Sequence, residues 1–341
     1  MKPDVHFRRG IGCIDCHDSV DLHGDGNIYS HQEYQVGIRC ESCHGGPSKR
    51  PAFRTERGDP LRNVVVIGAK PYLRTKILEE EHIIPVLHTS AGESPEPAPI
   101  WHDGHEKLEC YACHSASMPQ CFGCHMVRDD SRMSPVDWAA GVGEGEPPDG
   151  EPPKSSLGGW SGQSLYQEWD NPVLGVNRRG RASPFIPGGQ AILTHLDLAG
   201  DRVGPDHTFT TSAGLYGFSM SPVQPHNISS ESRTCSSCHS SKKTMGLGTE
   251  FADLKRLGIG LNFPPDRLVN EDGGRIQDSG HEGVRPFNGE ELATLLRTDF
   301  CILCHERSSE TRQWRFAPGS LKEADRLHKE AIQKAFQAGK E

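Results

Sequence analysis

Six copies of one short motif constrain this chain more than any other feature of its sequence. Each copy contains two cysteines separated by two residues, with a histidine directly after the second cysteine. The cysteine pairs are Cys13 and Cys16, Cys40 and Cys43, Cys110 and Cys113, Cys121 and Cys124, Cys235 and Cys238, and Cys301 and Cys304. They use all 12 cysteines of the chain. Any fold of this sequence must therefore serve the chemistry of six Cys-x-x-Cys-His units.

This motif is the attachment signature of c-type haem. Each thiol adds to one vinyl group of a porphyrin, and the histidine that follows lies under the iron as its proximal ligand. The sequence thus predicts six covalent haem c groups, whose proximal ligands are His17, His44, His114, His125, His239 and His305. The third and fourth motifs are almost back to back, so we expect their haems to form a closely stacked pair.

Zinc and disulfides are the alternative uses of these cysteines. A Cys-x-x-Cys pair can form half of a tetrahedral zinc site, and cysteines can also pair with one another. Neither chemistry requires a histidine directly after the second cysteine. With 18 His in 341 residues, six such histidines arise by chance on the order of 1 time in 10 million or less. We therefore favour covalent haem.

Histidines outside the motifs are candidates for the distal ligand on the other side of each iron. Our first choices are His6, His23, His88, His105, His226 and His328, and our second choices are His31, His102, His207 and His281. Residues 224–234 lead from His226 directly into the fifth motif. His328 lies in an apolar helical stripe and could instead be a packed core residue. Met118 or Met126 could also serve, although methionine usually accompanies higher potentials.

Composition and spacing predict three regions. The 38 Gly and 25 Pro favour a chain that is mostly coil, with short α-helices wrapped around a row of covalent haems. Residues 1–134 form a four-haem domain, residues 135–231 a haem-free, Pro/Gly-rich insert with a β-hairpin at 189–203, and residues 232–341 a two-haem region that ends in a helix. The insert could be a structural cover over haem edges, a partner-docking surface or a substrate lid.

Local patterns predict several elements. The apolar segments 63–67 and 82–88 are typical of strands. Asn288 and Glu291 form a capping box for a helix over 289–297, which leads to Cys301. Ser320 and Glu323 predict a second helix that extends to about residue 338.

Charge and hydropathy limit location and partners. The net charge of −9 argues against nucleic acid as a partner, and no run of 18 apolar residues indicates a membrane span. Because haem is attached outside the cytoplasm, we expect a periplasmic or extracellular, cell-surface protein whose export signal is not in this sequence. Redox proteins and other cytochromes are the expected partners.

Several segments resemble the multihaem c-type cytochromes of anaerobic, metal- and sulfur-respiring bacteria and archaea. The similar segments are residues 10–17, 23–26, 38–45 and 105–110. The resemblance implies bis-histidine haems arranged in a chain that carries electrons from one end to the other. Some extracellular six-haem members of that group polymerise into conductive filaments.

Three functions follow from these patterns. The first is electron transfer in anaerobic or extracellular respiration, without catalytic residues of its own. The second is an oxidoreductase that acts on a small nitrogen or sulfur compound at one open, five-coordinate haem, with an acid or base nearby. The third is a filament subunit, in which a neighbouring molecule supplies a distal histidine. We predict a carrier or conduit rather than an enzyme.

Overall fold

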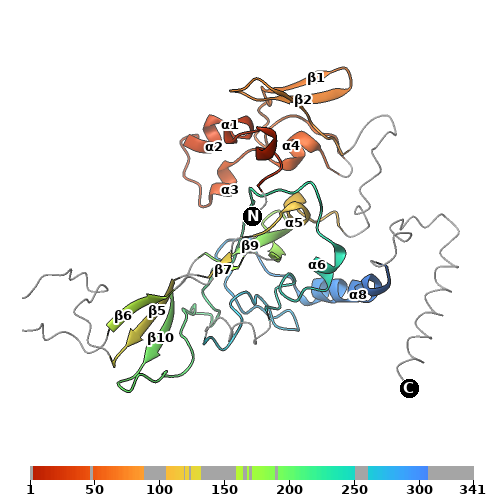
Figure 1. Cartoon of the computed structure of the whole chain (residues 1–341). Helices are drawn as coiled ribbons and strands as arrows, with labels where there is room; N and C mark the ends of the chain where they lie inside the picture. The colour runs from red at the N-terminus through yellow and green to blue at the C-terminus, as the bar shows by residue number, and fades with distance from the viewer. Residues whose placement is uncertain are drawn as a thin grey trace, which may run out of the picture.

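A computed structural model describes residues 3–46, 49–87, 105–118, 120–122, 124–131, 159–163, 167–168, 171–188, 191–249 and 260–305. Residues 3–87, called the N-terminal module below, lie at the top of Figure 1. This module contains the 3-10 helix η1 (Phe7–Arg9) and the helices α1 (Cys13–Cys16), α2 (Ser19–His23), α3 (Gln32–Gln35) and α4 (Cys40–His44). Its strands are β1 (Val64–Ile67), β2 (Lys70–Arg74) and β3 (Glu81–Ile83).

Buried polar contacts hold the N-terminal module together more than an apolar core does. Asp21 is 2 % exposed and accepts hydrogen bonds from the Gly37 amide and the Arg57 guanidinium. Among its described residues, Leu73 and Ile84 are the buried hydrophobic side chains. So small a core contributes little to the stability of a unit of this size.

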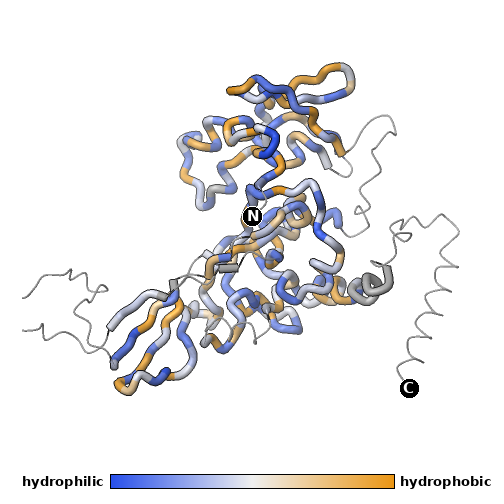
Figure 2. The backbone as a smooth tube through the Cα atoms, viewed as in Figure 1, coloured by the Kyte–Doolittle hydropathy of each residue, from blue (hydrophilic) through white to orange (hydrophobic). Residues whose placement is uncertain are grey.

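The strand predicted at 63–67 is confirmed as β1. The strand predicted at 82–88 is confirmed only at its first two residues, because β3 runs from Glu81 to Ile83 and residues 84–87 are not in a strand; residue 88 lies outside the described residues. Antiparallel pairing joins β1, β2 and β3 in that order, so β1 is an outer strand of this sheet. β1 has no charged residue and exposes Val66 and Ile67. Figure 2 shows the apolar character of this hairpin.

The larger part of the fold consists of short strands and three motif-bearing helices. Its helices are α5 (Cys110–His114), α6 (Cys235–His239) and α8 (Gly289–His305). Its strands are β4 (Gln120–Cys121), β5 (Cys124–Asp129), β6 (Gly159–Gln163), β7 (Gln167–Glu168), β8 (Val173–Val176), β9 (Ala182–Ile186), β10 (Ala191–Leu196) and β11 (Ser221–Pro222). The sheets have the orders β10-β5-β6, β11-β9-β8 and β4-β7. β10 and β5 are parallel to each other.

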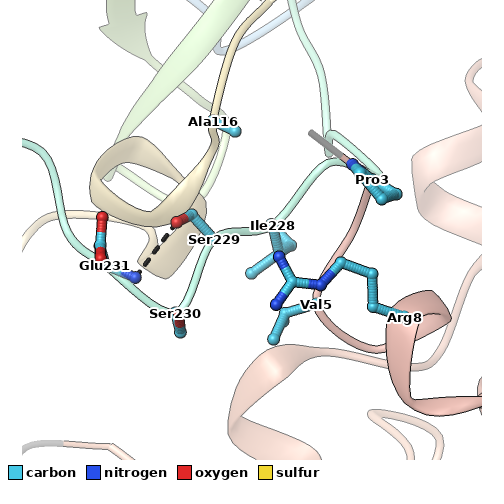
Figure 3. A pocket seen from close by; sticks show the side chains of 8 residues that line it. All are labelled: Pro3, Val5, Arg8, Ala116, Ile228, Ser229, Ser230 and Glu231. Atoms are coloured by element: carbon cyan, nitrogen blue, oxygen red, sulfur yellow. Dashed lines mark hydrogen bonds between the residues drawn. The ribbon is translucent and has the colours of Figure 1, made fainter. Parts of the chain in front are cut away.

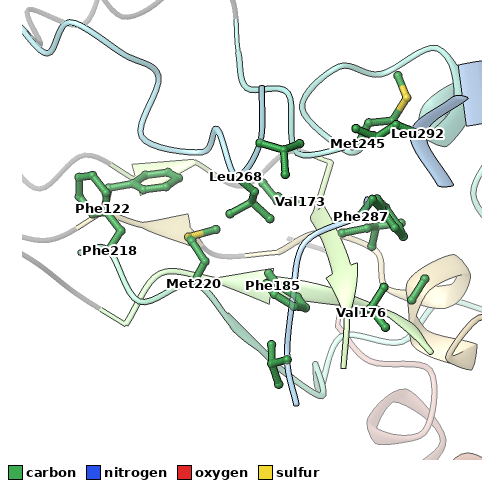
Figure 4. Close-up of a cluster of buried hydrophobic side chains, with 14 of the residues drawn as sticks. Phe122, Val173, Val176, Phe185, Phe218, Met220, Met245, Leu268, Phe287 and Leu292 are labelled. Carbon is green, nitrogen blue, oxygen red and sulfur yellow. The ribbon is translucent and has the colours of Figure 1, made fainter. Parts of the chain in front are cut away.

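The apolar core lies among β8, β9 and the loops around them (Figure 4). Phe122, Phe185 and Phe218 are fully buried in it. Phe185 packs directly over Gly175, where an added Cβ would lie 2.6 Å from the ring. The core includes residues on both sides of the boundary predicted at 134, and so does the sheet that β5 forms with β6 and β10.

The predicted capping box is confirmed at the start of α8. The Asn288 amide donates to Glu291 Oε2 at 2.9 Å, and the Glu291 amide donates to Asn288 Oδ1 at 2.9 Å. The helix continues past the predicted end to His305 and so contains the sixth motif. The helix predicted after Ser320 lies outside the described residues.

The hairpin predicted at 189–203 is confirmed at its turn. The Asp197 amide donates to the Asp201 carbonyl, and Leu196 pairs with Arg202. Gly200 in this turn has a φ of 85°, which favours glycine. The long parallel contact of β10 with β5 was not predicted, because it joins segments far apart in the sequence.

Several contacts join the N-terminal module to the rest of the chain, and two of them involve Ile228 and Arg181. The Val5 amide donates to the Ile228 carbonyl, and the Ile228 amide donates to Asp4. A cavity of about 130 Å³ lies beside this contact, lined by Arg8 and Ala116 among others (Figure 3). At the second contact, Arg181 in the turn between β8 and β9 forms an ion pair with Glu41. Within the part of the chain that the structure describes, no helix could span a membrane.

Candidate haem-binding sites

The motifs are helical at five of the six positions. Helices α1, α4, α5 and α6 consist almost entirely of motif residues, and the sixth motif ends α8. Residues three and four apart lie on one face of a helix. A helical Cys-x-x-Cys-His unit therefore presents both thiols and the imidazole toward the same side, which is the arrangement that one covalently attached porphyrin requires.

The fourth motif differs from the other five. Its first cysteine ends β4, and its second cysteine and its histidine begin β5. Its first spacer residue, Phe122, is fully buried against Phe218 with the ring centres 6.0 Å apart. His125 is 6 % exposed, and its Nε2 lies 2.7 Å from Thr194 Oγ1. Packing of Phe122 and pairing of β5 with two strands favour an extended backbone at this motif.

The histidines that end four of the motifs use Nδ1 for hydrogen bonds. His44, His114 and His239 donate from Nδ1 to backbone carbonyls at 2.8, 3.1 and 3.2 Å. His17 Nδ1 lies 3.1 Å from the buried Asp21 carboxylate. A metal-binding histidine usually makes such a bond with the nitrogen that does not bind the metal. Each Nδ1 contact leaves Nε2 as the nitrogen for an iron.

Three of these histidines each face one histidine from outside the motifs. The ring centres are 6.0 Å apart for His17 and His226, 6.0 Å for His44 and His6, and 6.1 Å for His239 and His105. With metal–nitrogen bonds of about 2 Å and ring centres about 1 Å further out, two axial imidazoles on one iron have centres about 6 Å apart.

The composition of the pairs favours ligation over ordinary ring packing. Aromatic contacts occur over about 4.5–7 Å, so the distance alone fits both. Each of these three pairs, however, joins one motif histidine to one predicted distal ligand. Burial also lowers the pKa of His44, which keeps its imidazole in the neutral form that binds metals.

The pairing differs from proximity along the chain. His226 precedes the fifth motif, yet its ring faces the first motif, while His105 precedes the third motif and faces the fifth. The contact between Val5 and Ile228 explains the first case, because it brings the N-terminal module against the segment that carries His226. Sequence reasoning selected these histidines but could not assign them to particular motifs.

The other predicted distal ligands lie in varied places. His23 and His207 are exposed. His31 and His281 stack with ring centres 3.3 Å apart, which is too close for an iron between them. His88, His102 and His328 lie outside the described residues, and of His305 the structure describes only the backbone. Met118 is buried, and Met126 is half-buried.

Contacts between thiols give the motifs an order in space. Cys16 lies close enough to Cys43 to influence the pKa of its thiol, and Cys113 has the same relation to Cys238. A hydrogen bond with Cys40 raises the pKa of Cys110. His239 of α6 contacts Leu295 of α8. The first, second, third and fifth motifs thus follow one another as neighbours, and α6, which holds the fifth motif, contacts α8.

The thiols are not arranged for zinc or for disulfides in the part of the chain that is described. None of the nine cysteines with described side chains forms a disulfide, and among the described residues no group of three or more Cys, His, Asp or Glu residues is placed to hold a metal ion. Burial raises the pKa of Cys16 to about 11 and that of Cys43 to about 12. Zinc binds thiolates, which these environments disfavour.

One group of polar residues was missed by sequence reasoning. Arg178, Arg179 and Arg181 occupy the turn between β8 and β9, and Arg178 lies over the ring of Tyr34 in the N-terminal module, 4.5 Å from its centre. The signal in the sequence that could have revealed this group was the presence of three arginines within four residues of an acidic chain.

Comparison with known protein families, curated proteins and solved structures found no match.

Proposed function

We propose that this chain is an electron-transfer protein of anaerobic or extracellular respiration that carries six covalently bound c-type haems. The observation that carries the proposal is the set of three histidine pairs with ring centres 6.0–6.1 Å apart. Each pair would provide the two axial ligands of one iron. The haems, when bound, supply the one-electron Fe(III)/Fe(II) couple.

The chain's own residues would attach and orient the haems. The cysteines of each motif form the covalent links, and Nε2 of the proximal histidine binds iron. The Nδ1 contacts of His17, His44, His114 and His239 fix the rings and increase the basicity of the ligand nitrogen. Two imidazoles on one iron leave no position for a substrate, which suits a carrier better than an enzyme.

The contacts between neighbouring motifs support a continuous row of sites. Thiols of the first and second, second and third, and third and fifth motifs influence one another, and α6 contacts α8. A row of this kind has two ends, at which redox proteins or other cytochromes would exchange electrons with the chain outside the cytoplasm. Self-association into filaments stays a prediction, which negative-stain imaging would test.

One observation favours the alternative, an oxidoreductase with one open haem. His125 Nε2 contacts Thr194 and lies 3.7 Å from Asp206. The histidine of the fourth motif therefore uses Nε2 for its contacts, whereas the histidines of the first, second, third and fifth motifs use Nδ1. An iron at this site would be the first place to look for an exchangeable ligand.

The test uses the exported, purified full chain and compares His226→Ala with His195→Ala. His195 is a suitable control because its Nε2 bonds to Asp130 at 2.7 Å. Absorption spectra before and after reduction, and after addition of carbon monoxide, report open irons. We expect only His226→Ala to gain a high-spin band and to bind carbon monoxide at one haem. Unchanged spectra for this variant would refute the pair of His17 with His226, and carbon monoxide binding by the unmodified protein would favour the enzyme.

A further inference from the structure

The turn between β8 and β9 holds its arginines rigidly. Asn177 Oδ1 accepts hydrogen bonds from the amides of Arg179 and Arg181, at 3.0 and 3.1 Å. Gly180 closes the turn with a φ of 71°. These contacts fix the backbone from which both guanidinium groups extend. The backbone positions of Arg179 and Arg181 are therefore set by hydrogen bonds within the turn.

The same turn is attached to the segment just before the third motif. The Ala182 amide donates to the Lys107 carbonyl at 2.7 Å, and the Glu109 amide donates to the Ala182 carbonyl at 2.9 Å. The Asn177 side chain donates to Glu109 at 2.8 Å. Since Cys110 follows directly, the position of the third motif is set by contacts with this turn.

A cavity of about 490 Å³ lies between the turn, the N-terminal module and the third motif. Cys110 and Leu108 belong to its wall, and an added Cβ at Gly46 in the same wall would contact no other atom within 4 Å. Six cationic side chains line it, together with three acidic ones. The cations are Arg39, Lys49, Arg50, Arg54, Arg179 and Arg181, and the acids are Glu41, Glu56 and Glu106.

The ion pairs in this region do not cancel its positive charge. Arg181 lies 2.7 Å from Glu41, and Arg39 lies 3.0 Å from Glu56. The buried Glu109 lies 3.5 Å from Arg179 and 3.7 Å from Arg181. Counting the buried Glu109 with Glu41, Glu56 and Glu106, four carboxylates face six cationic side chains, which leaves an excess of two positive charges around the cavity. A cavity with excess positive charge attracts an anionic ligand.

We propose that this cavity receives the carboxylate groups of the haem attached to the third motif, with Arg39, Arg179 and Arg181 as positioning residues that raise its reduction potential. The proposal rests on the proposed function. A predicted haem-attaching thiol and a set of cations line one cavity, and a porphyrin carries two carboxylates on the same macrocycle as its vinyl groups, on the two pyrrole rings without vinyl groups. Cations near an iron stabilise its reduced, less positive state. The haem-free insert thereby acts on a haem through its arginines.

The test is a redox titration of the double variant Arg179→Gln/Arg181→Gln, followed by optical absorption. Removing a charge about 10 Å away at an effective dielectric constant of about 20 changes the redox equilibrium by at least about tenfold. We therefore expect one haem to titrate at a potential lower by about 59 mV or more, the one-electron equivalent of tenfold. The control Arg267→Gln, which removes an arginine paired with the exposed Glu271, should leave every potential unchanged.

The outcomes separate this proposal from the proposed function. If the double variant carries its haems and all reduction potentials are unchanged, the inference alone is overturned. If the unmodified protein carries no covalent haem, the proposed function is overturned. Arg181→Lys should keep the original potential, since it keeps the charge; a shift as large as that of Arg181→Gln would also overturn the inference. Added nitrite or sulfite provides a further check. If either anion shifts a reduction potential of the unmodified protein but not of the double variant, the cavity binds a free oxyanion and the inference is overturned.

Discussion

Replacing Phe122 by alanine tests whether the fourth motif lies in the apolar core. The Phe122 side chain is 0 % exposed, and its ring meets Phe218 edge-on at 6.0 Å. Phenylalanine to alanine changes in well-packed cores cost about 3–5 kcal/mol, and an edge-to-face pair contributes about 0.5–1.5 kcal/mol beyond burial. We therefore expect a loss of about 4 kcal/mol in the free energy of unfolding.

The matched control is Ile14→Ala, at the same spacer position of the first motif. Ile14 is 39 % exposed, so its loss should cost less than about 1 kcal/mol. Urea unfolding, followed by far-UV circular dichroism, measures both variants. With a slope of about 2 kcal/mol per molar urea, Phe122→Ala should lower the midpoint by about 2 M. Haem content from the intact mass must equal that of the unmodified protein.

A small midpoint shift for Phe122→Ala, similar to that of Ile14→Ala, would refute the reasoning. It would mean that Phe122 leaves the core in the folded protein. The fourth motif would then resemble the other five, and His125 would be available to an iron as a proximal ligand.

Two further changes test the contacts of His125 and of α8. Thr194→Val removes the hydroxyl that contacts both His125 Nε2 and Asp206. Because two buried polar groups then lose a partner, the free energy of unfolding should fall by about 1–3 kcal/mol. An unchanged free energy of unfolding in urea would show that His125 does not make this contact. Hydrogen bonds from Arg285 and from the Asn288 amide hold the pKa of Glu291 below its ordinary value. Because the folded-state pKa is lowered, this contribution is present above the unfolded pKa of about 4.3 and is lost as pH falls through the folded value. Glu291→Gln should therefore reduce the loss of stability between pH 5 and pH 3, by less than about 1 kcal/mol since the pair is partly exposed; an unchanged pH profile would contradict this.

Local features of the fold could be predicted from the sequence. The capping box of Asn288 and Glu291 depends on residues three apart, and the turn at 197–201 depends on its own glycine and aspartates. Each signal is complete within a few residues, so no knowledge of distant packing is needed.

Features that depend on distant contacts could not be predicted. The pairs of His226 with His17 and of His105 with His239 follow from backbone contacts between remote segments. The extended fourth motif follows from burial of Phe122, for which an aromatic spacer residue was a weak signal, since Tyr111 in the helical third motif is buried as well. The arginine turn of the insert was visible as a charge cluster but had no evident partner.

The histidine pairs also imply an order of assembly. His6 and His44 both belong to the first short stretch of the chain, so this pair can close as soon as the N-terminal module is available to fold. His17 must wait for His226, and His239 must fold back to meet His105. If these rings bind iron, the first haem attached would keep an open coordination position while more than half of the chain is still being delivered. Premature oxidation or capture of a foreign ligand at that iron is then a hazard of biogenesis, and fast closure of the contact between Val5 and Ile228 would limit it.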